Sequence, residues 1–149
     1  MDRTEQTVHH MLAAIEAPLT MSAFSAAAAC CPDSIAIPTS AVLDRLSLLR
    51  YRNARRSHIY LRPSGEHRYT VLDDPDQAKL VRLSADRIEP CAVVETSRRS
   101  FQAWLKHTTV LPKLLGTFAA QTLAARYGAD PRRPTGWIAL TSTRSARNA

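Results

Sequence analysis

The sequence predicts an α+β fold in which helices pack against an antiparallel sheet of about four strands. Apolar residues recur at helical spacing in several segments, and short runs rich in β-branched and aromatic residues lie between them. Turn residues separate neighbouring runs. From residue 57 onward the expected order of elements is ββαββα, which suits helices packed on one face of an antiparallel sheet.

The N-terminal part, residues 1–56, is expected to be a helical segment. Residues 4–17 and 41–49 each have an amphipathic pattern, and Pro18 ends the first of them. A basic run, RYRNARRS, follows at 50–57. A solvated surface is the ordinary explanation of such a run, and contact with nucleic acid is the alternative.

Residues 57–131 are expected to form the α+β core. SHIYLRP and HRYTVLDD are strand patterns joined by a turn with Gly65 at its tip, which predicts a hairpin. Pro75 opens a short helix, a position where its missing N–H donor costs nothing. CAVVETS and FQAWLKH are the next two strands, with Arg98 and Arg99 as a tight link.

The longest helix closes this core. It is expected to start at Pro112 and to run to Tyr127, and Gly128 is a natural C-terminal cap. The remaining residues, 132–149, are expected to be a divergent, disordered tail.

Composition and charge narrow the class of protein. The chain has 149 residues, 45% hydrophobic and 22% charged, which suits one globular domain. Its formal charge of +7 is compatible with a phosphate backbone as partner, because neutralising phosphates releases counterions. A basic surface without any nucleic acid role explains the charge equally well.

Membrane and zinc sites are not expected. No apolar stretch reaches the roughly 18 residues that span a bilayer, and the first ten residues lack the pattern of a secretory signal. We therefore expect a cytoplasmic protein with reduced thiols. Cys30, Cys31 and Cys91 form no CxxC pair and have no histidine at zinc spacing.

Asp73 and Asp74 are the first candidate site. They follow an apolar strand and precede a proline. Two adjacent ionised carboxylates repel each other unless a cation lies nearby, and Mg²⁺ prefers such oxygen ligands. Asp-Asp-Pro-Asp is also good turn chemistry, and the spacing alone favours a solvated turn.

Four sequence blocks that follow one another in order favour a metal site at Asp73 and Asp74 over a solvated turn. HIYLRPSGEHRYTVLDD, EPCAVVETS, FQAWLKH and LAARYGADP together cover about half of the chain. This arrangement resembles the primase domain of RepB-type plasmid replication proteins, within the archaeo-eukaryotic primase superfamily. The resemblance implies a primase/RRM-like catalytic core.

The resemblance also implies roles for particular residues. It makes Asp73, Asp74 and Asp130 the catalytic, metal-binding carboxylates for Mg²⁺ or Mn²⁺. Residues implied to bind substrate or nucleic acid lie on the strands nearby: Arg62, Glu95, Thr96, Gln102, Trp104 and Lys106. An ordinary surface salt bridge explains Arg62 equally well, and the core is the more frequent place for a tryptophan such as Trp104.

The implied function is a DNA primase, a nucleotidyltransferase of plasmid or mobile-element replication. It would make short primers on a single-stranded DNA template from nucleoside triphosphates, with a plasmid helicase or relaxase as an open further partner. The alternative is a non-catalytic single-stranded DNA-binding module of a replication or mobilisation protein. A structural protein without a nucleic acid role would require all four blocks to be coincidence.

Two segments depart from the family pattern. Arg98, Arg99 and Ser100 replace its usual turn, and the tail GWIALTSTRSARNA replaces an arginine-rich stretch. We hypothesise that a frame change altered the tail, because a shift of one base in TSTR can encode Arg-Leu-Pro-Gly. AFSAAAACCPD invites the same hypothesis. An altered tail would weaken or abolish activity, so whether this chain is an active enzyme stays open.

Overall fold

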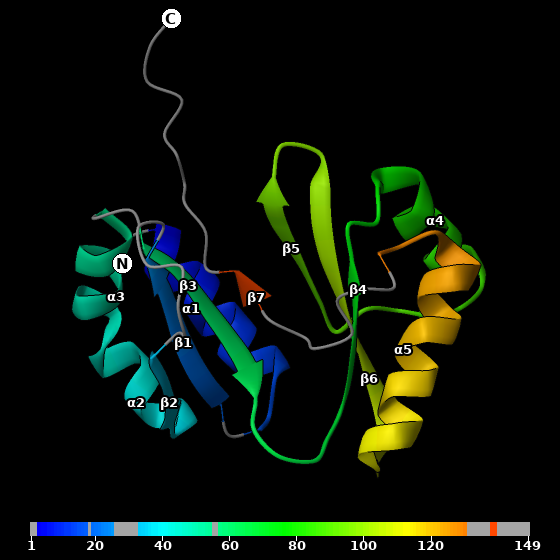
Figure 1. Ribbon diagram of the computed structural model, residues 1–149. Helices are drawn as coiled ribbons and strands as arrows, with labels where there is room; N and C mark the ends of the chain where they lie inside the picture. The colour runs from blue at the N-terminus through cyan, green and yellow to red at the C-terminus, as the bar shows by residue number, and fades with distance from the viewer. Residues whose placement is uncertain (1–2, 18, 26–32, 55–56, 131–137, 140–149) are drawn as a thin grey trace, which may run out of the picture.

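A computed structural model describes residues 3–17, 19–25, 33–54, 57–130 and 138–139. Helices and strands follow one another along the chain as shown in Figure 1. They are α1 (Arg3–Ala14), β1 (Leu19–Ser25), β2 (Asp33–Ile37), α2 (Thr39–Asp44), α3 (Leu46–Ala54), β3 (Ser57–Pro63), β4 (His67–Asp73), α4 (Gln77–Ala85), β5 (Ala92–Ser97), β6 (Ser100–Leu111), α5 (Lys113–Tyr127) and β7 (Ile138–Ala139).

The strands form two antiparallel sheets, which we call the N-terminal sheet and the central sheet. The N-terminal sheet has the order β2-β1-β3-β7, and the central sheet has the order β4-β6-β5. The expected α+β class is therefore confirmed, with helices packed on antiparallel strands. The expected hairpin is wrong, because β3 pairs with β1 whereas β4 pairs with β6.

The N-terminal part differs most from the expectation of a helical segment. It contains β1 and β2 as well as its helices, and these strands extend the sheet that holds β3. The second expected helix is divided into α2 and α3 at Arg45. Part of AFSAAAACCPD, residues 26–32, lies outside the described residues. We call α1, α2, α3 and the N-terminal sheet the N-terminal module.

The expectation of a disordered tail over 132–149 mostly falls on residues 132–137 and 140–149, which lie outside the described part of the chain. Within that tail, Ile138 and Ala139 pair with Leu61 and Tyr60 of β3. This short strand therefore joins the N-terminal sheet instead of being disordered.

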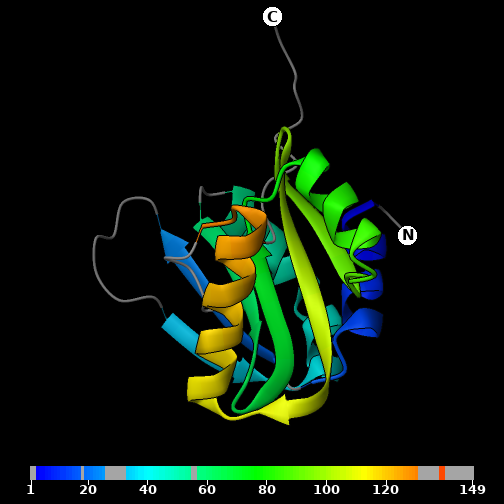
Figure 2. The same ribbon diagram turned by 90° about the vertical axis from the view of Figure 1, so that its right-hand side faces the viewer.

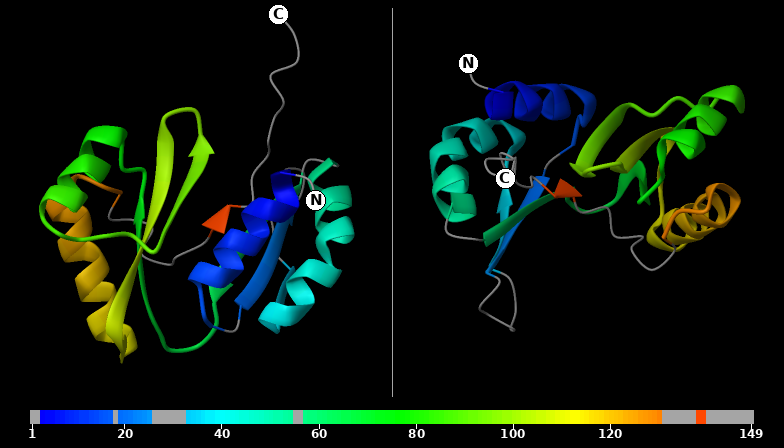
Figure 3. Two further views of the ribbon diagram at one scale, coloured as in Figure 1. Left: turned by 180° about the vertical axis from the view of Figure 1, so that it is seen from behind. Right: turned by 90° about the horizontal axis from the view of Figure 1, so that it is seen from above.

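The central sheet is covered on both faces. Leu72, Ala103 and Leu105 point toward α4 and α5 and pack against Leu83 and Tyr127. Residues of the opposite face pack against the N-terminal module in a second cluster, which comprises Val8, Met11, Ile15, Leu19, Val42, Leu46, Leu49, Leu61, Tyr69, Val71 and Trp104. Figures 2 and 3 show α5 against the central sheet on the side away from α1 and α3.

The ends of the helices follow the sequence signals. Asp76 caps α4, where its side chain accepts a hydrogen bond from the backbone of Lys79 at 2.9 Å. Pro112 precedes α5, and Gly128 ends it with a left-handed φ of 62°. Among the described residues, no helix has both the length and the apolar character needed to cross a membrane.

Candidate active site

The turn after β4 places the two neighbouring aspartates. Asp73 is the last residue of β4, and Asp74 has a φ of 61°, in the left-handed region that aspartate tolerates better than most residues. The backbone N–H of Asp74 donates to the carbonyl oxygen of Phe101 at 3.0 Å. This bond ties the turn to β6.

Asp130 reaches the same place from the other end of the core. After the Gly128 cap, the N–H of Ala129 donates to the carbonyl of Ala124, and the N–H of Asp130 then donates to the carbonyl oxygen of Asp73 at 3.0 Å. The backbone of Asp130 therefore lies beside that of Asp73 and Asp74, although the two segments are far apart in the sequence. Within the described residues, no three or more His, Cys, Asp or Glu side chains already form a group that could hold a metal.

Two side chains of β6 orient the aspartate pair. The Gln102 amide Nε2 donates to Oδ1 of Asp73 at 2.9 Å, and the Ser100 hydroxyl donates to Oδ1 of Asp74. Asp73 lies opposite Gln102 in the register of β4 and β6, and Gln102 is only 6% exposed. Ser100 is a site residue that the sequence did not predict. Ser100 lies two residues before Gln102, so the two side chains share one face of β6. This places Ser100 near the aspartates only once the pairing of β6 with β4 is known.

Gln102, Trp104 and Lys106 share one face of β6 but have different surroundings. Trp104 is 0% exposed and belongs to the core beneath the N-terminal module. It is therefore a core residue and offers no surface for stacking a base. Lys106 lies four residues beyond Gln102, about 13 Å along the strand, and its Nζ is 3.1 Å from Oε2 of Glu16.

The structure does not bring the other residues implied by the resemblance, Arg62, Glu95 and Thr96, into contact with the aspartates in the part of the chain that it describes. Arg62 is the last residue but one of β3 and lies on the side of His67, at the far end of β4 from Asp73. Burial lowers the pKa of His67, and the charge of Arg62 lowers it as well. Glu95 is exposed on β5 opposite Phe101, so alternation directs it to the other face from Gln102. The side chain of Thr96 lies outside the described part of the structure.

Solved structures include close matches in fold. The catalytic domain of primase RepB′, solved in complex with initiator DNA, matches with a TM-score of 0.85 and 29% identity over 93% of this chain and 76% of that one. A further structure of primase RepB′ matches with a TM-score of 0.84 and 28% identity over 93% and 49% of the two chains. The AEP domain of the cyanophage S-2L primase-polymerase shares the fold, with a TM-score of 0.59 and 16% identity.

Sequence comparisons agree with the fold. Mobilization protein A of Escherichia coli is 36% identical over 92 residues, and the match covers 60% of this chain but only 13% of that protein. The family model of the RepB DNA-primase N-terminal domain matches residues 5–138. The chain therefore belongs to the RepB DNA-primase N-terminal domain family.

Proposed function

We propose that this domain is the catalytic part of a plasmid-type DNA primase, with Asp73, Asp74 and Asp130 at its centre. The hydrogen bond from the Asp130 amide to the Asp73 carbonyl is the observation on which the proposal depends most. It brings the backbone of Asp130 beside that of Asp73, so acidic residues of two distant segments lie close together. Carboxylates that share a site repel one another unless a cation lies nearby, and a bound metal ion removes that repulsion.

The donor set fits Mg²⁺ or Mn²⁺. Mg²⁺ typically uses one or two protein carboxylates and completes its shell with water and substrate phosphates, so a closed cage of protein ligands is not required. The carboxylates of Asp73 and Asp74 would hold the ion, with Asp130 as a third contributor. A bound divalent ion would neutralise the triphosphate and activate the attacking hydroxyl of the primer.

The chain's own residues would supply positioning. Gln102 donates to one oxygen of Asp73, which holds that carboxylate in one orientation, and Ser100 does the same for Asp74. Such fixed orientation matters because nucleotidyl transfer depends on alignment and charge stabilisation rather than on a covalent intermediate. Thr96 on β5 is the proposed neighbour of the bound nucleotide, whereas Glu95 faces away from Gln102 and receives no role at the aspartate centre. Arg62, on β3 of the N-terminal sheet, and Lys106, on β6 of the central sheet, are proposed contacts of the template away from that centre.

The relatives support the proposed partners. One is a primase catalytic domain solved with initiator DNA, which supports DNA as the template here, and we propose that this template is single-stranded. Another is a mobilisation protein, which supports a role in plasmid replication or transfer, and a relaxase or helicase is the proposed further partner. Because this chain spans 13% of that protein, we assign only the primase step to it.

The decisive experiment is primer synthesis on single-stranded DNA with nucleoside triphosphates and Mg²⁺ or Mn²⁺. We expect the Asp73→Asn variant to lose at least about a hundred-fold in rate, a loss on the scale of other electrostatic contributions to catalysis. Asp44→Asn is the matched control, because Asp44 is an exposed residue of α2 in the N-terminal module, outside the aspartate centre.

A wild-type rate that Asp73→Asn does not change would contradict the proposal. If the wild-type chain binds single-stranded DNA but makes no primer with either metal, the non-catalytic binding module is the better assignment. Binding should fall with rising salt in both cases, so salt dependence does not separate the two functions.

A further inference from the structure

The outer face of α3 combines an exposed aromatic ring with arginines. Five of the twelve residues from 45 to 56 are arginines, and none is acidic. Tyr51 is 57% exposed and Leu48 is 40% exposed, whereas Leu46 and Leu49 of the same helix are buried in the core. The helix is thus anchored on one side and presents a basic, partly aromatic surface on the other.

Helical spacing fixes how these side chains are arranged. Each residue is rotated by about 100° from the one before it. Tyr51 therefore points away from buried Leu49, with Arg50 and Arg52 flanking it on its two sides. Arg50 is exposed and Arg52 is half-buried. Arg45, at the junction of α2 and α3, is also exposed and lies five residues before Arg50.

We infer that this face of α3 is a second contact surface for single-stranded DNA, separate from the aspartate centre. The inference deepens the proposed function, because it says where a template is held outside the active site. Arginines beside an aromatic ring match what single strands offer, namely phosphates at regular intervals and unpaired bases that stack on rings. A duplex offers phosphates but no free base faces.

The rest of the molecule provides a contrast. Phe118 on α5 is 65% exposed, but its exposed apolar neighbours are Leu114 and Leu115. Figure 1 and the view from above in Figure 3 place α3 and α5 at opposite ends of the molecule. Tyr51 is therefore an exposed aromatic residue with arginines beside it, whereas Phe118 is one with leucines beside it. Only the surroundings of Tyr51 have the positive charge that a polyanion requires.

The test is fluorescence anisotropy with a labelled oligothymidine of about 20 nucleotides, longer than one such platform covers. Loss of one stacked base is expected to raise the Kd of Tyr51→Ala about ten-fold. Tyr51→Phe should keep wild-type affinity, because the ring remains. Phe118→Ala, which removes an equally exposed ring, should change the Kd less than two-fold, or about 0.4 kcal/mol.

The arginines are tested by the salt dependence of the same binding. The pair Arg50→Gln and Arg52→Gln should reduce the slope of log K against log salt by about 1.4, since each phosphate contact with a single strand contributes about 0.7. Arg87→Gln with Lys113→Gln removes the same charge elsewhere and should leave the slope almost unchanged.

Equal losses in the Tyr51→Ala and Phe118→Ala variants would overturn the inference, and so would equal losses with a duplex of the same length. Equal slopes for the two charge pairs would overturn it as well. These outcomes are separate from the proposed function, because binding is measured without synthesis. A chain without Asp73-dependent synthesis could still bind DNA through Tyr51, and an active primase could fail this test.

Discussion

At the scale of single residues, Trp104 shows how position decides what a side chain can do. Its side chain is 0% exposed and lies between the central sheet and the N-terminal module, with its ring centroid 6.5 Å from that of Tyr69. Its Nε1 is buried and has no hydrogen-bond partner in the described part of the protein. The residue therefore stabilises the fold by packing, and its N–H reduces that gain.

Truncation of Trp104 should measure this contribution. We expect Trp104→Ala to lower the free energy of unfolding by about 3–5 kcal/mol, because it leaves a large cavity. Trp104→Phe should cost clearly less, since it keeps an aromatic ring and removes the unpaired N–H. Urea unfolding measures both, with exposed Phe118→Ala as the control at under about 0.5 kcal/mol. Similar losses in Trp104→Ala and Phe118→Ala would contradict the assignment to the core.

The sequence pointed to the three aspartates of the candidate site but not to the hydrogen bonds that hold them. Asp73 and Asp130 could be placed by resemblance, because each has a distinctive sequence context. The hydrogen bond from the Asp130 amide to Asp73 and the one from the Ser100 hydroxyl to Asp74 depend on which strands pair and on where α5 ends in space. Neither fact is encoded locally, so periodicity and spacing could not supply them.

At the scale of elements, α5 offers a matched test of backbone conformation. Gly128 ends the helix with a φ of 62°, and a Cβ there would meet Lys79 at 3.4 Å. Gly116 lies inside the helix, and a Cβ there would meet only Leu111 at 3.8 Å. One position requires glycine and the other does not.

Gly128→Ala and Gly116→Ala should therefore change the free energy of unfolding in opposite directions, as measured by thermal or urea unfolding. Gly128→Ala is expected to destabilise the protein by about 1 kcal/mol, because alanine is strained in the left-handed region. Gly116→Ala is expected to stabilise it by roughly 0.5–1 kcal/mol through better helix propensity. Equal effects of the two substitutions would mean that the cap is not formed as described.

The elements after residue 66 were predicted well because their signals are local. Strand β4, helix α4, the β5–β6 pair and α5 each have their own turn, proline or cap. The partner of β3 was predicted wrongly, because a short turn suggested β4 while its actual partner β1 lies far back in the chain. Strands β1 and β2 were missed, although Leu19, Met21 and Ala23 of β1 alternate with Thr20 and Ser22. Strand β2, DSIAI, is too short for a period of two residues to stand out.

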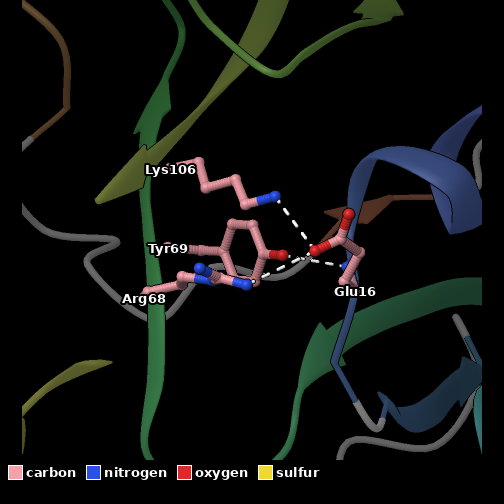
Figure 4. A network of polar contacts seen from close by, with 4 residues as sticks. All are labelled: Glu16, Arg68, Tyr69 and Lys106. Carbon is pink, nitrogen blue, oxygen red and sulfur yellow. Dashed lines mark hydrogen bonds and ion pairs between the residues drawn. The ribbon is translucent and has the colours of Figure 1, made fainter. Parts of the chain in front are cut away.

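At the scale of the whole molecule, a polar network joins the N-terminal module to the central sheet. Figure 4 shows Glu16, from the segment between α1 and β1, facing three residues of β4 and β6. Its Oε2 accepts from Lys106 at 3.1 Å and from Arg68 at 3.3 Å, and its backbone N–H donates to the Tyr69 hydroxyl at 2.9 Å. Ion pairs and a hydrogen bond thus link the N-terminal module to the central sheet, in addition to the apolar contacts between them.

This network predicts a dependence of stability on pH. The hydrogen bond from Lys106, and then its charge, hold the pKa of Glu16 below the ordinary value, and Arg68 lowers it further. A carboxyl with a lowered pKa in the folded state stabilises the fold above its unfolded pKa, and this stabilisation is lost as the pH falls through the folded pKa. The effect is small, because the Glu16 side chain is 60% exposed and solvent screens it.

The urea midpoint of the wild type should therefore exceed that of Glu16→Gln at pH 7, and the difference should shrink as the pH falls below about 4.3, the pKa of glutamate in an unfolded chain. Glu89→Gln, at an exposed position outside the network, removes the same charge and controls for net charge alone. High salt at pH 7 should narrow the Glu16 difference as well, because screening weakens partly exposed ion pairs. A difference that stays constant from pH 7 to pH 3 would show that the Glu16 carboxylate does not link the two modules by charge.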